Sequence, residues 1–331
     1  SINAIIAYVD NHEISQDELI KIIKAPDFPT GATIFGYSGV REAYETGRGK
    51  IVIRSKCEVE SEDGHDRIIV TEIPYMVNKS ELVVKIVDLV NEKKIDGITE
   101  VRDESDKSGT RIVIELRRDA IANIVLNHLY KNTALQSSFG VNNIALVNGR
   151  PQLLTLREMV KCFVDHRHDV VTRRAIYEKR KAEERAHILE GLIIASDNID
   201  EVIKIIRGAS SPDEARNSLM VRFNLTEIQA RAIVEMRLRQ LTGLEQDKLH
   251  VEYNKLKEHI AYLTELSASE PMRMEVIKNE LIEIREKYGD ERRTEIVMSA
   301  GEFNPEDFYA DEEMVITVSH MGYIKRTPLA E

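Results

Sequence analysis

The sequence has 331 residues, a length that favours two or three structural units over one compact domain. Hydrophobic residues make up 42% and charged residues 31%, which is ordinary for a soluble protein, and no apolar run approaches the length of a membrane span. The formal net charge of −11 excludes a protein that is basic throughout, so any nucleic-acid contact has to be a local patch.

The first residues of the sequence and its two cysteines bear on the compartment in which the protein is expected. Residues 1–4 carry no basic segment typical of a signal peptide and no initial Met, so we expect a piece of a longer protein. Cys57 and Cys162 lie far apart and form no CxxC motif. They are expected to be packing residues of a cytoplasmic protein, and neither a disulfide nor a zinc site is predicted.

Residues 1–28 are predicted to be helical. Apolar residues recur at helical spacing on both sides of Ser15, which indicates two short helices with Ser15 as the N-cap of the second. Pro26 then ends the helical pattern and marks a boundary.

Residues 29–155 are predicted to form an α/β domain with a mainly antiparallel sheet. Alternating polar and apolar residues indicate one strand over 50–60 and its hairpin partner over 67–73. A helix separates this hairpin from a second one over 98–116. A further helix and a loop-rich stretch that reaches Pro151 complete the domain.

The next part of the chain is predicted to be almost wholly helical. We expect a long helix over 156–195, a group of short helices over 196–245 and a return helix over 246–295. Apolar residues spaced alternately three and four apart along the return helix indicate an antiparallel coiled coil with a helical knob at its far end. At 1.5 Å per residue each arm is about 50 Å long. The predicted seam of the outgoing helix is Met159, Phe163, Val170 and Tyr177.

Residues 296–331 are predicted to be a linker followed by a β-hairpin. Its strands are expected over 314–318 and 322–326, with Ser319-His320-Met321 at the turn. Because a lone hairpin is only marginally stable in water, we expect a β domain to continue beyond this sequence.

Several ordered stretches of the sequence resemble the A subunits of bacterial type IIA DNA topoisomerases. Each stretch alone is a weak signal, but their order along essentially the whole chain is specific. The density of matches in 156–192 favours the gyrase branch of this family, and topoisomerase IV is the alternative. The matching stretches are Ala43–Lys50, Arg102–Lys107, Leu135–Gly140, His166–Arg167, Val170–Arg174, Arg185–Leu192, Met236–Glu245 and Ser319–Arg326.

The resemblance implies a multidomain α+β architecture. Residues 1–28 would be a helical remnant of the DNA-cleavage domain, and 29–155 would be the tower domain. The coiled coil would carry a dimer gate on the knob at 196–245. The last segment, 296–331, would end in the first hairpin of a truncated C-terminal β domain.

The resemblance also implies an activity and partners. The family breaks, passes and rejoins duplex DNA, as a homodimer that works with a B subunit; ATP and Mg²⁺ belong to that partner, and no cofactor is expected in this segment. Gyrases use the cycle for ATP-dependent negative supercoiling. The family's nucleophilic tyrosine follows an arginine, and none of the eleven tyrosines here does. This segment alone is therefore expected to hold no catalytic residue and to be inactive.

Residues 41–57 are enriched in basic side chains, with five basic residues and only two acidic ones. The segment Gly47-Arg48-Gly49-Lys50 could bring backbone N–H groups and cations onto phosphates. The alternative is a helix C-cap followed by a solvated turn, and the order helix, glycine, strand excludes a P-loop. The predicted DNA-binding residues are Arg48, Lys50, Arg54, Lys56, Lys131 and Gln136.

Residues 229–244 are rich in Ile, Leu and Met on two helix faces. One face can serve the fold, and the second indicates a partner; a fully buried helix is the alternative. The resemblance places the dimer gate here. The predicted dimer-gate residues are Ile233, Met236, Leu238, Leu241 and Leu244.

Two polar clusters have competing interpretations. The carboxylates of 103–106 could bind a hard cation, but the flanking strands favour a turn, and no metal ligand is predicted. The basic cluster His166, Arg167, His168, Arg173 and Arg174 could face DNA or a domain joint, or form a solvated helix face.

A structural coiled-coil scaffold with incidental DNA binding is the alternative of another class. It explains 156–290 well, but it explains the basic, strand-rich domain and the final hairpin poorly.

Overall fold

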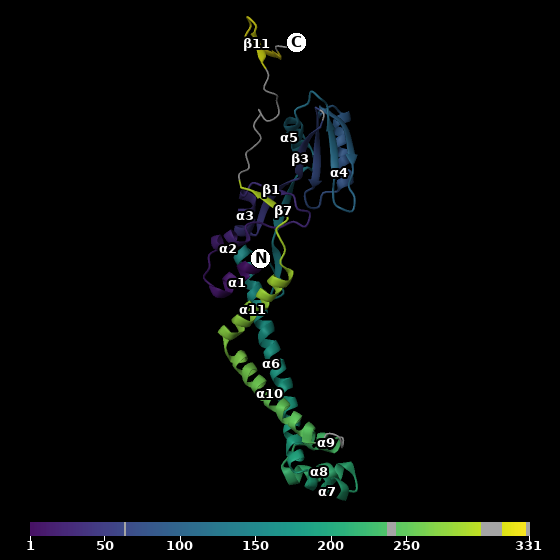
Figure 1. Ribbon diagram of the computed structural model, residues 1–331. Coiled ribbons are helices and arrows are strands. Elements are labelled where there is room, and N and C mark those ends of the chain that lie inside the picture. The colour runs from purple at the N-terminus through teal and green to yellow at the C-terminus, as the bar shows by residue number, and fades with distance from the viewer. Residues whose placement is uncertain (63, 237–242, 299–312, 329–331) are drawn as a thin grey trace. The chain divides into compact units, whose positions relative to one another are not determined.

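The computed structural model describes residues 1–62, 64–236, 243–298 and 313–328 (Figure 1). The chain forms two compact units: unit 1 contains residues 3–160 together with the chain from 288 onward, and unit 2 contains 161–287. The predicted multidomain α+β class with mainly antiparallel sheets is confirmed. In the described ranges, no helix has the length and apolarity needed to cross a membrane.

Unit 1 begins with the two predicted short helices, α1 (Ile2–Asp10) and α2 (Gln16–Ile23). Ser15 caps α2 as expected: its Oγ accepts from the backbone N–H of Glu18, whose carboxylate accepts from the N–H of Ser15.

The first sheet of unit 1 has the strand order β10-β1-β2-β7. The β1–β2 and β2–β7 pairs are antiparallel, whereas β10 runs parallel to β1. Helix α3 (Ser38–Thr46) packs closely on β2. The strands are β1 (Thr33–Phe35), β2 (Arg48–Arg54), β7 (Gln136–Asn142) and β10 (Glu295–Val297).

The second sheet of unit 1 is wholly antiparallel, with the order β3-β4-β6-β5. Helices α4 (Lys79–Asn91) and α5 (Ala122–Asn132) pack on the apolar face of this sheet, where Ile68, Ile86 and Leu129 are fully buried. The second predicted hairpin, β5–β6, is confirmed. The strands are β3 (Lys56–Glu62), β4 (His65–Glu72), β5 (Ile98–Asp103) and β6 (Ile112–Leu116).

The predicted single strand over 50–60 is wrong, because the chain leaves one sheet and enters the other at Ser55. The buried Ser55 donates its backbone N–H to the carbonyl of Leu135 at 2.8 Å, and β2 and β3 lie on either side of it in different sheets. Period-two alternation continues across this point, so the pattern alone does not reveal the change of sheet.

The predicted loop-rich stretch before Pro151 is also wrong. It holds β7 and a hairpin of β8 (Ile144–Val147) and β9 (Arg150–Leu153), whose turn residues Asn148 and Gly149 both have positive φ. Ser, Gly and Asn are poor strand formers, but backbone pairing with β2 overrides that preference in β7.

Unit 2 is helical and contains most of α6 (Leu156–Asp197), the predicted long outgoing helix. The return arm is divided at Ser269 into α10 (Gly243–Ala268) and α11 (Glu270–Tyr288), close to the expected interruption by Pro271. The predicted antiparallel pairing is confirmed, because contacts move backward along the return arm as α6 advances. Arg167 binds Glu280 at 2.5 Å, and Arg185 binds Glu252 at 2.8 Å.

The predicted apolar seam of α6 is wrong by one residue. Phe163 and Tyr177 are 39% and 54% exposed, whereas Val164 and Val171 are fully buried. The sequence carries apolar doublets at Phe163-Val164 and Val170-Val171, so the spacing there fits two adjacent phases. The buried apolar side chains of α6 are those of Leu156, Val160, Val164, Val171, Ala175, Ala182, Ala186, Leu189, Leu192 and Ala195.

The knob of unit 2 contains three short helices packed on the end of α6. Their common core includes Leu189, Leu219 and Ala230, which are fully buried. The predicted caps are confirmed, with Ser211 accepting from the Glu214 N–H and Thr226 forming a capping box. The helices are α7 (Ile199–Gly208), α8 (Pro212–Phe223) and α9 (Glu227–Val234).

The predicted C-terminal hairpin is confirmed as β11 (Met314–Val318) paired antiparallel with β12 (Ile324–Pro328). Its turn is closed by the backbone N–H of Gly322, which donates to the carbonyl of Ser319 at 2.9 Å.

Candidate nucleic-acid interface

One face of the β2–β7 pair carries most of the predicted DNA-binding residues. Side chains alternate between the two faces of a strand, so every second residue of β2 and of β7 lies on this face. We call it the β2–β7 face. Its opposed pairs are Arg48 with Asn142, Lys50 with Gly140, Val52 with Ser138, and Arg54 with Gln136.

The exposed end of the β2–β7 face is basic and polar. Arg48 and Lys50 are exposed, and so are Asn142 and Gly140 opposite them. Among the described residues, the side chains of Arg48 and Lys50 have no hydrogen bond or ion pair. Two unpaired cations next to small polar neighbours leave room for a phosphate backbone to approach.

The other end of the β2–β7 face is closed by Arg54. Its Nε donates to Oε1 of Gln136 at 2.5 Å, and its guanidinium carbon lies 3.3 Å from the centroid of the Phe35 ring. Tyr130 covers it as well, with a centroid distance of 4.9 Å. Burial lowers the pKa of Arg54. Arg54 and Gln136 therefore bind each other and hold this part of unit 1 together, a structural role that competes with the predicted DNA contact.

Lys56 and Lys131 lie off the β2–β7 face. Lys56 is in β3, and its Nζ is 3.1 Å from Oε1 of Glu295 in β10; this hydrogen bond raises the pKa of Lys56. Lys131 is exposed in the last turn of α5. Of the six predicted DNA-binding residues, Arg48 and Lys50 thus best fit a phosphate contact.

The glycines of the Gly47-Arg48-Gly49-Lys50 segment serve packing and do not form a phosphate cradle. Gly47 ends α3 with φ 79°, which confirms the C-cap alternative. Gly49 lies inside β2 against the α3 backbone, where an added Cβ would be 2.5 Å from the Gly39 carbonyl oxygen and 2.7 Å from the Ala43 nitrogen. Any phosphate contact here must come from the side chains of Arg48 and Lys50.

Ser138 and Asn142 are polar members of the β2–β7 face that the sequence interpretation missed. The sequence predicts a loop-rich stretch here, and a predicted loop gives no information on which side chains share a face. Alternation along 136–142 could have indicated a strand with two distinct faces. One face carries Gln136, Ser138, Gly140 and Asn142, and the other carries Ser137, Phe139 and Val141.

The acidic stretch 103–106 runs from the end of β5 into the predicted hairpin turn, which the pairing of Asp106 with Gly109 closes. Lys79 binds Asp103 at 2.8 Å, and hydrogen bonds from Lys79 and Ser105 lower the pKa of Asp103 to about 2. Asp106 accepts from the backbone N–H of Ser108 at 2.8 Å. These carboxylates therefore have local partners that shape the hairpin.

The basic cluster near the start of α6 joins two helices of unit 2. Arg167 and Arg174 both bind the carboxylate of Glu280 in α11, each at 2.5 Å. His168 accepts from Nε of Arg273 at 2.8 Å. The joint interpretation fits these residues better than a DNA-facing one.

The predicted dimer-gate residues fall into two groups. Ile233 is 2% exposed in the knob core, so it cannot also present a surface in this conformation, and Met236 packs against the same core. Leu238 and Leu241 lie outside the described residues, as does the side chain of Leu244. Among the described residues of the knob, the exposed large apolar side chains are instead Val221 on α8, 88% exposed, and Ile228 on α9, 61% exposed.

The Arg54→Ala variant should separate the structural role of Arg54 from a DNA contact. It loses the contacts with both rings and with Gln136, so we expect unit 1 to be destabilised by about 1–2 kcal/mol. Arg54→Lys should recover little, because an ammonium lacks the flat guanidinium plane. Urea unfolding followed by far-UV circular dichroism measures the change. Unaltered stability with weakened DNA binding would contradict the structural role.

Comparison with known proteins places these features in a family. Residues 1–282 match the family model that describes the A subunit of DNA gyrase and topoisomerase IV. The DNA gyrase A subunit of Halalkalibacterium halodurans is 53% identical over 329 residues, which cover 99% of this chain and 40% of that protein. The proteins of the same name from Staphylococcus epidermidis and Staphylococcus aureus are each 51% identical over 332 residues, covering 99% of this chain and 37% and 38% of their own lengths. The chain thus spans well under half the length of these relatives.

Proposed function

The chain belongs to the family of DNA gyrase and topoisomerase IV A subunits, and from this premise we propose that it is the tower, arm and exit-gate portion of a gyrase A subunit. Residues 29–155 serve as the tower and 1–28 as the end of the cleavage domain. The α6 helix and the return arm form the hinged coiled coil, and 196–245 form the gate. The hairpin within 296–331 begins the C-terminal β domain.

The proposed substrate is duplex DNA, bound along its phosphate backbone by the β2–β7 face. The observation that carries this proposal is the pair Arg48 and Lys50, exposed and unpaired among the described residues at one end of that face. Phosphate contacts position a protein on DNA without reading its sequence, which suits an enzyme that acts on DNA topology.

The proposed assembly is a homodimer that works with a B subunit in the cytoplasm. Val221 and Ile228 are the apolar side chains we assign to self-association of the knob. The B subunit supplies the ATP site and the catalytic Mg²⁺, and the complete enzyme introduces negative supercoils. Relatives named as A subunits of DNA gyrase support gyrase over topoisomerase IV. A structural scaffold without gate function would not need an exposed basic strand end on unit 1.

No tyrosine of this chain follows an arginine, as the family's nucleophile does, so we expect the isolated chain to form no covalent adduct with DNA in the presence of Mg²⁺. Burial raises the pKa of the phenols of Tyr44 and Tyr130, which makes both poor nucleophiles. Denaturing electrophoresis of end-labelled duplex after incubation with the chain checks this expectation. A protein-linked DNA band would contradict it.

The complete enzyme provides the second arm of this test. The full-length A subunit, combined with ATP and its B subunit, should convert relaxed plasmid into negatively supercoiled plasmid. Decatenation without supercoiling would replace gyrase by topoisomerase IV. If a well-folded complex shows neither supercoiling nor decatenation, the proposed function is contradicted.

A further inference from the structure

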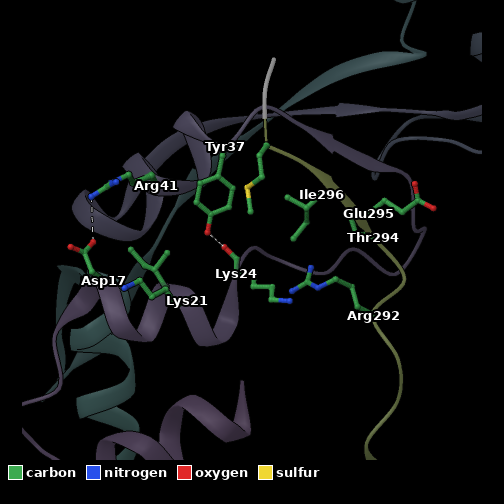
Figure 2. A pocket seen from close by; sticks show the side chains of 11 residues that line it. Asp17, Lys21, Lys24, Tyr37, Arg41, Arg292, Thr294, Glu295 and Ile296 are labelled. Atoms are coloured by element: carbon green, nitrogen blue, oxygen red, sulfur yellow. Dashed lines mark hydrogen bonds and ion pairs between the residues drawn. The ribbon is translucent and has the colours of Figure 1, made fainter. Parts of the chain in front are cut away.

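A cavity of unit 1 lies away from the β2–β7 face and has no role in the proposed function. It has a volume of about 910 Å³, within the usual range of ligand pockets. Its walls come from α2, the start of α3 and the segment around β10 (Figure 2). The lining includes the apolar side chains Ile20, Ile296 and Met298 and the cations Lys21, Lys24, Arg41 and Arg292.

Two of these cations are free to bind a ligand. Arg41 is already paired with Asp17 at 3.3 Å and with Glu45 at 2.6 Å. Lys21 and Lys24 are exposed, and their side chains have no ion pair with any described residue. Of the two carboxylates on the lining, Asp17 is held by Arg41, and Glu295 is held by Lys56. The cavity therefore presents unneutralised positive charge.

The backbone that carries Lys24 is strained and held in place. Lys24 has φ 66°, a value that residues with a Cβ rarely adopt. The Tyr37 hydroxyl donates to the Lys24 carbonyl, and Arg292 donates to the carbonyls of Ile23 and Ala25 at 3.0 and 2.6 Å. These bonds fix the position of Lys24 at the wall of the cavity, and backbone strain of this kind is typical of binding sites.

The free edge of a sheet also lies at this cavity. β10 is the outer strand of its sheet and pairs only with β1 among the described strands. The N–H of Glu295 bonds the Ala32 carbonyl at 3.0 Å, and the carbonyl of Val297 accepts from Gly36 at 2.9 Å. Because these groups alternate along a strand, the N–H and C=O of Ile296 point to the open side. Figure 2 shows the Ile296 side chain directed toward the cavity and Glu295 directed away from it.

We propose that this cavity binds an acidic peptide segment in extended conformation, which adds to the open edge of β10 and places its carboxylates against Lys21 and Lys24. A peptide strand can exchange both backbone hydrogen bonds with Ile296. Every second side chain of the added strand would face the cavity, so these positions would carry the carboxylates and an apolar side chain that lies on Ile20, Ile296 and Met298. A phosphate group would use the lysines, but it would leave the strand edge and the apolar lining unused.

Fluorescence anisotropy tests the proposal with a labelled hexapeptide of glutamate, threonine, valine, threonine, glutamate and threonine, in which the glutamates and the valine share one face of the strand. Replacing both lysines, Lys21→Gln with Lys24→Gln, should weaken binding about three- to tenfold, as expected for two partly exposed charge pairs. The matched control, Lys85→Gln with Lys204→Gln, removes the same charge from exposed positions elsewhere and should leave the affinity unchanged. The same hexapeptide with lysine in place of both glutamates should not bind.

The backbone contact has its own pair of variants. Ile296→Pro removes the outward N–H without removing a bond to β1, and it should abolish measurable binding of the peptide. Ile296→Val keeps the N–H and should retain binding. Thermal unfolding checks that both variants are folded. Equal affinity of the Pro and Val variants, or of the lysine variant and its control, would overturn the proposal. Binding of inorganic phosphate that depends on Lys21 and Lys24 but not on Ile296, with no peptide binding, would also overturn it.

Discussion

The Gly49→Ala variant should unfold much of unit 1 and lose DNA binding with it. The new methyl group would lie 2.5 Å from the carbonyl oxygen of Gly39 and 2.9 Å from the Cα of Ala43. Both atoms belong to backbone, so no side chain can rotate away, and α3 must move off β2. We expect a loss of at least about 3 kcal/mol in the unfolding free energy, above the usual cost of overpacking. Urea unfolding followed by circular dichroism measures it.

Gly140→Ala is the matched control for this prediction. Gly140 lies opposite Lys50 on the neighbouring strand, and an added Cβ there would have no atom within 4 Å. Its stability should change by no more than about 0.5 kcal/mol. If both variants unfold alike, the close approach of α3 to β2 is not what makes Gly49 necessary.

The double variant Val221→Asp with Ile228→Asp should convert the proposed dimer into a monomer. Both side chains are exposed within one chain, at 88% and 61%, so a carboxylate at either place leaves the knob core intact. In a dimer the same positions would bury charge without a partner, which costs several kcal/mol. We expect the dimer dissociation constant to rise by about a hundredfold or more. Sedimentation over a concentration series measures the change.

Val84→Asp provides the comparison for the dimer variant. Val84 is 58% exposed on α4 of unit 1, outside the knob, and its substitution should leave the dimer intact. If the dimer dissociation constant of the knob variant equals that of the unmodified chain, the self-association surface lies elsewhere in the chain.

Prediction of the fold succeeded where a local signal decides the structure. The helix caps at Ser15, Ser211 and Thr226 are each satisfied by the residue three positions further on, so the sequence alone indicates them. The long helix and its antiparallel return follow from apolar spacing. The phase of the α6 seam could not be chosen, because Phe163-Val164 and Val170-Val171 offer two equivalent phases, and only packing selects one.

The fold was mispredicted where a distant partner decides the structure. The chain changes sheets at Ser55 because Leu135, far along the sequence, accepts its N–H. β7 is a strand because β2 supplies the ladder, although its own residues favour a loop.

The candidate site divides in the same way. Exposure of Arg48 and Lys50 could be predicted from alternation within β2. The engagement of Arg54 could not, since Phe35, Tyr130 and Gln136 come from three other elements. The partner of Lys56 could not be predicted either, because Lys56 donates a hydrogen bond to Glu295, which lies 239 positions further along the sequence.

The salt dependence of duplex DNA affinity counts the phosphate contacts made by the β2–β7 face. Each phosphate contact that is lost should make the negative slope of log K against log salt concentration shallower by about 0.9, so Arg48→Ala with Lys50→Ala should reduce its magnitude by about one to two. The control, Lys85→Ala with Lys204→Ala, removes equal charge and should retain the original slope. Equal slopes and affinities for all three proteins would contradict a phosphate contact by the β2–β7 face.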